Sequence, residues 1–515
     1  MIVEDQGEVI AFLSRPGAFG SGVSRVDRVE THVSVVFLAG EQAYKLKRAV
    51  RFPYLDFSTR ELRREFCEAE VRINRRTAPE IYRRVVAVNR KANGSLGLGG
   101  GGQPVEWLVE MARFDEDTLF DRLAQRSALD ATVIENLGDV IARFHDKAER
   151  RLNAGGPAAI ARIIDGNARS FADCPPGCCD SSRVKRLTET TRRALGSCIV
   201  LLGERSRAGF VRHCHGDLHL RNIFLDNGRP TLFDAIEFSA ALADIDVLYD
   251  IAFLIMDLEY RDLRPLASIL LNRYLDNTGD AGGLKALPLF LSLRAAIRSH
   301  VDAAAASSQS DPREAKKLRE AAHRYLEMAI AFLLPHAPRL IAVGGLSGTG
   351  KSLVARGLAP FLGGVPGARV VRTDSTRKRL AGVRLSARLG QDGYTPEMDK
   401  RTYQAALEEA RVALAAGHSV IADAVFARPQ ERRAIAKVAE DCGVPFQGLW
   451  LETEPEVMQE RVTGRRGDVS DATAEVVRAQ LEYDLGPVDW PRLDAAGPVK
   501  QTVAQGVRLL GLEKA

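Results

Sequence analysis

Cysteine, long apolar runs and net charge are all scarce in this sequence of 515 residues, and each scarcity argues against a class of protein. The seven cysteines are odd in number and scattered, so they do not suggest a disulfide framework and favour a reduced, cytoplasmic protein. The longest apolar run, residues 328–335, is far shorter than the roughly 18–20 residues that span a bilayer, which predicts no membrane segment. The first residues carry acids where a secretory signal carries basic residues.

The charge balance argues against a nucleic-acid partner. The 72 basic and 67 acidic residues leave a net charge of +5, which is a weak excess over this length. Hydrophobic residues make up 45% of the chain and charged residues 27%, the profile of a globular protein with a sizeable core. At roughly 100–200 residues per domain, the length predicts about two to four domains.

The hydrophobic pattern changes its period along the chain. Strand-like patterns dominate at first, helical periodicity follows, and a proline-containing breaker then precedes an alternation of strands and helices. We therefore predict a first domain over residues 1–335, with a small β-rich lobe of about 1–112 and a helical lobe of about 113–335. The second domain, residues 336–515, is predicted to be an α/β domain with a mostly parallel sheet.

Residues 345–352 (GLSGTGKS) match the phosphate-loop pattern GxxxxGK[ST] at each position, between an apolar strand and a predicted helix. In such a loop the glycines let backbone N–H groups wrap the phosphates, and the lysine reaches the β- and γ-phosphates. The last hydroxyl is placed to bind Mg²⁺. The predicted nucleotide contacts are Gly345, Ser347, Gly348, Thr349, Gly350, Lys351 and Ser352.

Two acids beyond this loop each end an apolar strand. Because functional groups gather beyond the carboxyl ends of parallel strands, Asp374 and Asp423 are expected to face the γ-phosphate. Asp374 suits the activation of an acceptor hydroxyl, and Asp423 suits the binding of Mg²⁺. A helix starting at residue 455 is expected to present Arg461 and Arg465 on one face, where they could close over the transferring phosphoryl group.

Together these motifs resemble those of the small P-loop kinases related to gluconate kinases, polynucleotide 5′-kinases and zeta-type toxin kinases, over residues 339–500. The resemblance implies an ATP-dependent transfer to a hydroxyl group, with Asp374 as the acid that activates the acceptor. The acceptor itself does not follow from it.

Residues 215–222 (HGDLHLRN) carry the strongest signal in the first half. Asp217 stands five residues before Asn222, and Asp234 follows in a strand-like stretch. This is the spacing by which a kinase catalytic loop supplies a base and then the ligands of Mg²⁺. Asp217 is therefore the predicted catalytic base, and Asn222 and Asp234 are the predicted metal ligands.

The HGDLHxxN pattern resembles the aminoglycoside phosphotransferase and choline kinase branch of the protein-kinase-like enzymes. The resemblance implies that Lys45 contacts the α- and β-phosphates, with Lys47 on the same strand face as the alternative. It also implies that Glu70 is the ion-pair partner of the lysine, with Glu65 and Glu68 as alternatives.

The same resemblance implies a hinge strand over residues 107–112, in which Glu110 and Met111 receive the adenine. Asp246 and Asp250 are expected to cap structure rather than take part in catalysis. The sequence departs from the family at the glycine-rich loop, because residues 30–32 (ETH) stand where GxGxxG is expected.

Further strings, such as residues 52–58 (FPYLDFS), look like one uncharacterised bacterial set that fuses a kinase-like domain to a C-terminal P-loop kinase. The expected fold is an α+β protein-kinase-like domain followed by an α/β P-loop domain. The expected function is a bifunctional phosphotransferase that uses ATP and Mg²⁺ and acts on hydroxyls of small molecules. Two alternatives stay open: a nucleotide-driven regulator with a degenerate kinase-like sensor, and a toxin-like or nucleic-acid-end kinase in the C-terminal half.

Overall fold

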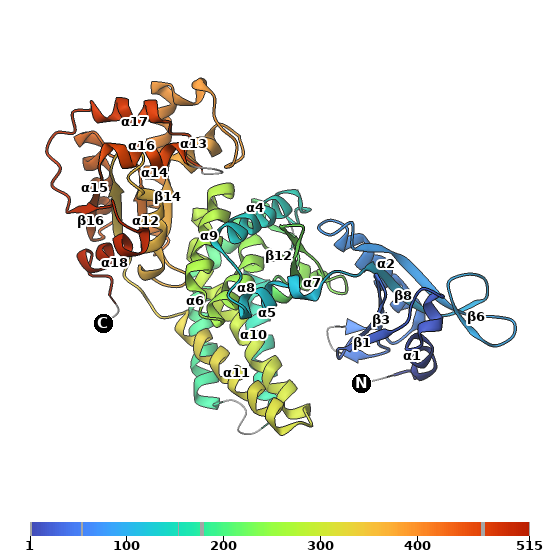
Figure 1. Ribbon diagram of the computed structural model, residues 1–515. Helices are drawn as coiled ribbons and strands as arrows, with labels where there is room; N and C mark the ends of the chain where they lie inside the picture. Colours follow the sequence, from blue (N-terminus) through green and yellow to red (C-terminus); the bar gives the residue numbers. More distant parts are fainter. Residues whose placement is uncertain (1–2, 53–54, 153, 176–179, 465–468, 514–515) are drawn as a thin grey trace. The chain divides into compact units, whose positions relative to one another are not determined.

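A computed structural model describes residues 3–52, 55–152, 154–175, 180–464 and 469–513, and Figure 1 labels many of its helices and strands. The chain forms two compact units. One consists of residues 1–129, 143–155 and 206–251, and the other of residues 130–142, 156–205 and 252–515. The predicted boundary at residue 336 lies inside the second unit.

The first unit is built on a six-stranded antiparallel sheet with the order β1-β2-β3-β8-β6-β7. Its core packs Phe37, Leu46 and Leu108 on one face. The turn between the second and third strands places Gly40 at a φ of 61°, a left-handed conformation that favours glycine. The strands are β1 (Val26–Glu30), β2 (Ser34–Ala39), β3 (Gln42–Lys47), β6 (Tyr82–Arg90), β7 (Leu96–Leu98) and β8 (Gln103–Ala112).

One helix, α2 (Arg60–Asn74), crosses the other face of this sheet. It begins at Thr59, whose hydroxyl accepts a hydrogen bond from the backbone N–H of Leu62 at 3.2 Å and so caps the first turn. Cys67 and Val71 on its buried side pack against Val109 of the sheet. The shorter elements near it are α1 (Gly7–Leu13), β4 (Arg51–Phe52), β5 (Leu55–Asp56) and α3 (Phe120–Gln125).

Two short ribbons hold the loop that contains residues 214–222. The N–H of Ile236 donates to the carbonyl of His215 at 2.9 Å, and the N–H of Phe233 donates to the carbonyl of Asn222 at 3.0 Å. The loop and residues 233–237 therefore lie side by side. The elements are β9 (Val211–His213) with β12 (Asp244–Asp246), β10 (Ile223–Asp226) with β11 (Arg229–Leu232), the 3-10 turn η3 (Leu220–Asn222) and α7 (Ala240–Ala243).

Helices make up the part of the second unit that precedes the parallel sheet. Ser292 and Ser299 on one helix donate to the carbonyls of Ala329 and Ala322 on the next, at 2.7 and 2.8 Å, which joins the two as a hairpin. Within the described residues, we find no helix with the length and apolar character to cross a membrane. The helices are α5 (Gly156–Ala172), α9 (Arg264–Thr278), α10 (Leu287–Ser308) and α11 (Pro312–Ala331), while α4 (Ala131–Lys147), α6 (Ser181–Arg207) and α8 (Val247–Tyr260) contain residues of both units.

The C-terminal region is a five-stranded parallel sheet with the order β14-β15-β13-β16-β17. Its core packs Ile341 and Leu449 of the sheet against Leu358 and Val507 of the helices. The strands are β13 (Leu340–Gly344), β14 (Arg369–Arg372), β15 (Val420–Asp423), β16 (Phe446–Glu452) and β17 (Arg492–Asp494). The helices are α12 (Lys351–Leu358), α13 (Thr373–Leu380), α14 (Pro396–Ala415), α15 (Pro429–Asp441), α16 (Pro455–Thr463), α17 (Ala474–Leu481) and α18 (Val499–Leu509).

These architectures confirm the predicted fold class. The first half contains an antiparallel sheet, a crossing helix and a helical region, and the C-terminal region is an α/β domain with a parallel sheet.

Acid should destabilise the protein through His418, whose Nε2 lies 2.8 Å from the carbonyl oxygen of Gly367. Burial lowers the pKa of His418 from 6.5 to about 4, so the folded state favours the neutral ring. Its contribution to stability is therefore complete above pH 6.5 and is lost as the pH falls toward 4. A shift of this size corresponds to about 3 kcal/mol.

We expect His418→Gln, which keeps a donor for Gly367, to flatten the fall of Tm over this pH range. Thermal unfolding of both chains between pH 6.5 and pH 4 is the measurement. A variant with the acid profile of the parent chain would contradict the assignment.

Candidate active sites

Two lysines of β3 share one buried glutamate of α2. Lys45 Nζ lies 2.9 Å from Glu70 Oε1, and Lys47 Nζ lies 2.5 Å from Glu70 Oε2. The two lysines are two residues apart on a strand, so both point to the same face of the sheet. Glu65 and Glu68 are exposed, whereas Glu70 is fully buried. In the structure both candidate lysines therefore contact Glu70, rather than Glu65 or Glu68.

Asp234 completes this network from the segment after β11. Its Oδ1 lies 2.6 Å from Lys45 Nζ, and its φ of 59° is left-handed, which is uncommon for a residue with a side chain. Two contacts hold the backbone in this conformation: the N–H of Asp234 donates to Tyr82 Oη at 3.1 Å, and the N–H of Ala235 donates to Asn74 Oδ1 at 2.7 Å. The carboxylate is 41% exposed and accessible to a ligand.

Lys47 has a second partner that the sequence analysis did not single out. Glu237, three residues after Asp234, forms an ion pair with Lys47 and is 6% exposed. The ring of Phe57 covers the ammonium group, with its centroid 4.9 Å from Nζ. The sequence signal that could have indicated Glu237 is its position as an acidic residue inside the largely apolar stretch 232–238.

The charges in this network depend on one another. Burial acts to lower the pKa of Lys45, but Asp234 and Glu70 outweigh it and raise the pKa well above its ordinary value. Burial acts to raise the pKa of Glu70, but Lys45 and Lys47 outweigh it and lower the pKa. Burial raises the pKa of Glu237 despite the nearby ammonium of Lys47. At neutral pH the lysines are therefore cationic and Glu70 is a carboxylate.

The structure also brings together Asp217 and Asn222. Asn222 Nδ2 donates to Asp217 Oδ2 at 3.0 Å and to the Asp217 carbonyl at 2.9 Å. His219 Nε2 lies 3.4 Å from the same oxygen, Asp217 Oδ2. The Asp217 carboxylate is 38% exposed, so an incoming hydroxyl can reach it.

Asp250 braces the backbone of this loop. Its oxygens accept the N–H groups of His215 and Gly216 at 3.0 and 2.9 Å, and His145 Nε2 lies 3.0 Å from Oδ2. The thiol of Cys214 lies beside them, within reach of a common metal ion. Because Asp250 is already engaged by these donors, we assign the cluster to loop structure, in line with the predicted capping role.

The hinge strand β8 presents its two predicted residues to opposite faces of the sheet. Met111 pairs with Ala43 and so shares the face of Lys45, whereas Glu110 pairs with Tyr44 on the other face. The Glu110 carboxylate is buried there and lies 2.9 Å from Arg84 Nε. Glu110 can therefore offer a nucleotide only its backbone on the Lys45 side.

A tight turn stands in place of the glycine-rich loop. The hydroxyl of Thr31 accepts the N–H groups of Val33 and Ser34 at 3.3 and 2.9 Å, which closes the connection between β1 and β2. Residues 30–32 thus lie at the predicted position, without the glycines of the family.

The phosphate loop follows β13 and ends at α12, as predicted. Gly345 and Gly348 have φ angles of 138° and 91°, and a Cβ at either position would lie 2.6 Å from the carbonyl oxygen of Leu451 or Met458. Only glycine fits this conformation and these close approaches. The loop is therefore shaped by its packing on β16 and α16 as well as by its own sequence.

The polar groups of the loop form a compact set. Lys351 Nζ donates to the carbonyl of Leu346 at 3.0 Å, and the Thr349 hydroxyl donates to the same oxygen at 2.8 Å. Ser352 lies close enough to Asp423 to act against the rise in the pKa of its carboxyl group. Hydroxyl and carboxylate oxygens suit Mg²⁺, so Ser352 and Asp423 fit the metal predicted for them.

Arg372 is a cation in this centre that the sequence analysis missed. Its Nε lies 3.4 Å from Asp423 Oδ2, and its side chain is 9% exposed. Burial raises the pKa of Asp423, while Arg372 and Lys351 oppose the shift and Asp374 adds to it. Asp374, partly buried in the first turn of α13, is thus close enough to act on Asp423.

Arg461 lies beside the phosphate loop, and its guanidinium is held by hydrogen bonds to backbone carbonyls. Its guanidinium donates to the carbonyls of Ala495 and Ala496 at 2.8 and 3.1 Å and reaches Thr349 O at 3.5 Å. The helix α16 (Pro455–Thr463) contains Arg461 as predicted, whereas Arg465 lies outside the described residues, so a helix face shared by the two arginines stays a prediction.

A second contact to the loop was also missed. The N–H of Ser347 donates to Gln480 Oε1 of α17 at 2.7 Å, and Leu346 packs against α16 and α17. No motif marks Gln480, because the contact depends on how α17 packs.

Comparisons with known proteins find similar proteins for the whole chain and for its parts. A family described as "AAA domain" matches residues 340–484. The uncharacterized protein Rv2004c of Mycobacterium tuberculosis is 31% identical over 497 residues, which cover 94% of this chain and 95% of that protein. Among solved structures, a choline kinase from Cryptosporidium parvum is similar over 63% of this chain and 93% of its own (12% identity, TM-score 0.40). A gluconokinase from Sinorhizobium meliloti is similar over 34% and 91% (24% identity, TM-score 0.24).

Removal of the Lys47 charge should destabilise the first unit. Lys47→Met leaves Glu237 buried without its ammonium partner, and a lone buried charge costs about 3 kcal/mol or more. We expect urea unfolding to show a loss of that size, and Lys47→Met combined with Glu237→Gln to recover part of it. A single variant as stable as the parent chain would refute the importance of this pair.

Proposed function

Because this chain belongs to the same family as Rv2004c of Mycobacterium tuberculosis and matches it along both halves, we propose one function for its whole length. It is a bifunctional phosphotransferase that uses ATP and Mg²⁺ and transfers the γ-phosphoryl group to hydroxyls of small molecules at two separate sites. The described cysteines are all free thiols, which supports the reduced cytoplasmic setting of this proposal.

The observation that carries the proposal is the network of Lys45, Glu70 and Asp234. These residues come from β3, α2 and the segment after β11, and yet their charged groups meet within 3 Å. Three distant parts of the chain supply a phosphate-binding cation, its anchor and a metal-binding carboxylate, which is the set that phosphoryl transfer needs.

At the first site Lys45 would bind the α- and β-phosphates, and Asn222 and Asp234 would hold Mg²⁺. Mg·ATP, when bound, supplies the γ-phosphoryl group and screens the developing charge. Asp217 orients the acceptor hydroxyl and takes its proton as the new oxygen–phosphorus bond forms and the bond to ADP breaks. Lys47 stays on Glu70 and keeps that carboxylate in place as Lys45 turns toward the phosphates.

At the second site the amides of the phosphate loop and Lys351 would bind the β- and γ-phosphates, and Ser352 and Asp423 would hold Mg²⁺. Asp374, which lies near Asp423, orients the hydroxyl of the second acceptor and takes its proton, as Asp217 does at the first site. Arg461, and Arg465 outside the described residues, would stabilise the charge on the transferring group.

One observation favours an alternative for the first half. The turn at Thr31 has no glycine amides that could cover the triphosphate. A domain that senses a nucleotide without turning it over would not need them. Formation of ADP on addition of an acceptor would exclude this sensor. A metabolite screen that measures ADP formation with the full chain is the direct test, and signals are assigned to a half with one inactivating variant for each.

We expect Asp234→Asn and Asp217→Asn to differ. Asp234→Asn should weaken Mg·ATP binding and turnover together, because it removes a metal ligand. Asp217→Asn should keep Mg·ATP affinity while kcat falls by roughly 10²–10⁴, the range for loss of a general base. Calorimetric titration beside melting curves separates the two, and equal loss of nucleotide binding in both variants would show that the roles are wrongly divided.

Lys351→Ala should abolish turnover at the second site and spare the first. The ammonium group contributes on the order of 3–4 kcal/mol in the transition state, like other single electrostatic donors. ADP formation is measured with Lys351→Ala, which reports on the first site, and with Asp234→Asn, which reports on the second. A folded Lys351→Ala chain with unchanged activity at the second site would disprove the phosphate-binding role.

A further inference from the structure

We propose that Asp276, which lies in helix α9 before the P-loop region, is a positioning residue of the second phosphotransferase site. Through Ser375 it holds the first turn of α13 and so sets the position of Asp374. The inference rests on the proposed function of that site.

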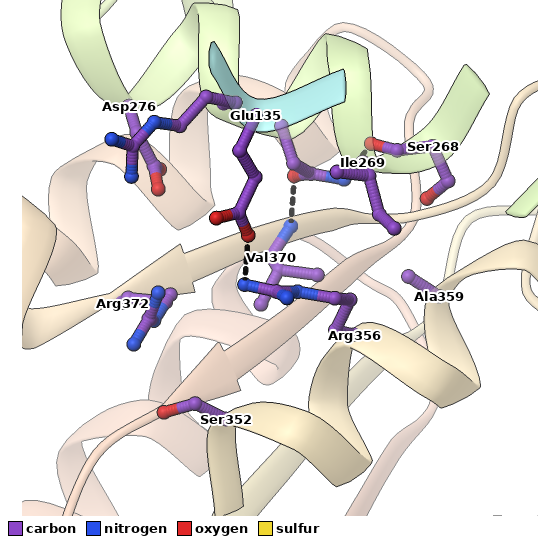
Figure 2. A pocket seen from close by; sticks show the side chains of 11 residues that line it. Glu135, Ser268, Ile269, Asp276, Ser352, Arg356, Ala359, Val370 and Arg372 are labelled. Carbon is purple, nitrogen blue, oxygen red and sulfur yellow. Dashed lines mark hydrogen bonds and ion pairs between the residues drawn. The ribbon is translucent and has the colours of Figure 1, made fainter. Parts of the chain in front are cut away.

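The helix α9 covers the open edge of the parallel sheet. Asn272 presents its carboxamide to the edge strand β14 as a neighbouring strand would: Oδ1 accepts the N–H of Val370 at 2.7 Å, and Nδ2 donates to the carbonyl of Ala368 at 3.1 Å. Figure 2 shows this contact at Val370, together with the nearby pair of Glu135 and Arg356, which point toward one another. The edge is thus closed by hydrogen bonds, as an exposed sheet edge requires.

One turn further along α9, Asp276 makes three different contacts. Its Oδ1 lies 2.6 Å from the guanidinium of Arg369 in β14, and its Oδ2 accepts the hydroxyl of Ser375 at 2.8 Å. Its backbone carbonyl accepts Arg379 Nη1 at 3.2 Å. Asp276 is 4% exposed and Ser375 fully buried, so water does not compete for these bonds.

The contacts bind α13 near both of its ends. Ser375 is the residue after Asp374 in the first turn, and Arg379 lies in the last turn. The helix is only eight residues long, so these contacts of α9 act on it at both ends, beside the ion pairs of Arg377 and Arg379 with α14. Asp374 must point at the acceptor oxygen, and an error of about 1 Å in such a group costs roughly a hundredfold in rate.

The space between α9 and the catalytic centre is small. A cavity of about 30 Å³, room for one or two water molecules, is lined by Asp276 on one side and by Arg372 and Ser352 on the other. In Figure 2, Arg372 on β14 and Ser352 on the phosphate-loop helix border the same cavity as Asp276. A shift of α9 therefore reaches the second site over a short distance.

The test uses the full chain with Asp234→Asn to silence the first site, and Mg·ATP with water as acceptor as the probe. We expect Asp276→Asn and Ser375→Ala to lower phosphate release by roughly tenfold to a hundredfold, with Mg·ATP affinity within about twofold. The double variant should lose little more than Asp276→Asn alone, because the Ser375 hydroxyl acts through its bond to Asp276. Hydrogen exchange over residues 373–380 should accelerate in both.

Asn272→Ala is the matched control, since it breaks the contact to β14 from the same helix without touching α13. It should leave phosphate release largely unchanged. An equal loss in Asn272→Ala, a parallel loss of Mg·ATP binding, or unchanged release in Asp276→Asn and Ser375→Ala would overturn the positioning role. If the Asp234→Asn chain releases phosphate no faster than the same chain with Lys351→Ala added, the proposed function of the second site is overturned, and the inference with it.

Discussion

A permanent positive charge inside the second unit is the constraint on which its arrangement depends. Arg369 is 1% exposed and cannot give up its proton at physiological pH, so its charge has to be matched by carboxylates. Glu409 on α14 and Asp276 on α9 provide them, at 2.7 and 2.6 Å. Because one carboxylate precedes the phosphate loop by about seventy residues and the other follows it, Arg369 ties the helical region to the parallel sheet.

The first unit also contains a buried charge, but there the charge is negative and is neutralised by two cations. Glu70 carries a negative charge into a fully buried position, and two lysines from one strand neutralise it. A single lysine would have to leave Glu70 partly uncompensated whenever it turned to a phosphate. With Lys47 in place, Lys45 is free to exchange Asp234 for a ligand at a smaller electrostatic cost. The second lysine thus makes the network tolerant of nucleotide binding.

Both candidate sites also rely on backbone conformations that their surroundings enforce. Asp234 is held at a positive φ by Tyr82 and Asn74, and the phosphate-loop glycines are confined by the carbonyls of Leu451 and Met458. Such conformations persist only where neighbouring elements over-determine them. In each site the chemistry is therefore carried by a short segment, and its shape by distant residues that pack on it.

The sequence alone determined the parts of this protein that depend on neighbours in the chain. The phosphate loop, the Asp217–Asn222 spacing and the change to a parallel sheet follow from local patterns. The lysine strand and its partner, for which Glu70, Glu65 and Glu68 were the candidates, followed from the family resemblance. Tertiary structure decided the partners: Glu237 for Lys47, Arg372 for Asp423, Gln480 for Ser347 and Asp276 for Ser375. These pairs join residues far apart in the chain or with no motif to mark them. The side chains that meet are set by the packing of helices on sheets, and that packing has no signature in a short stretch of sequence.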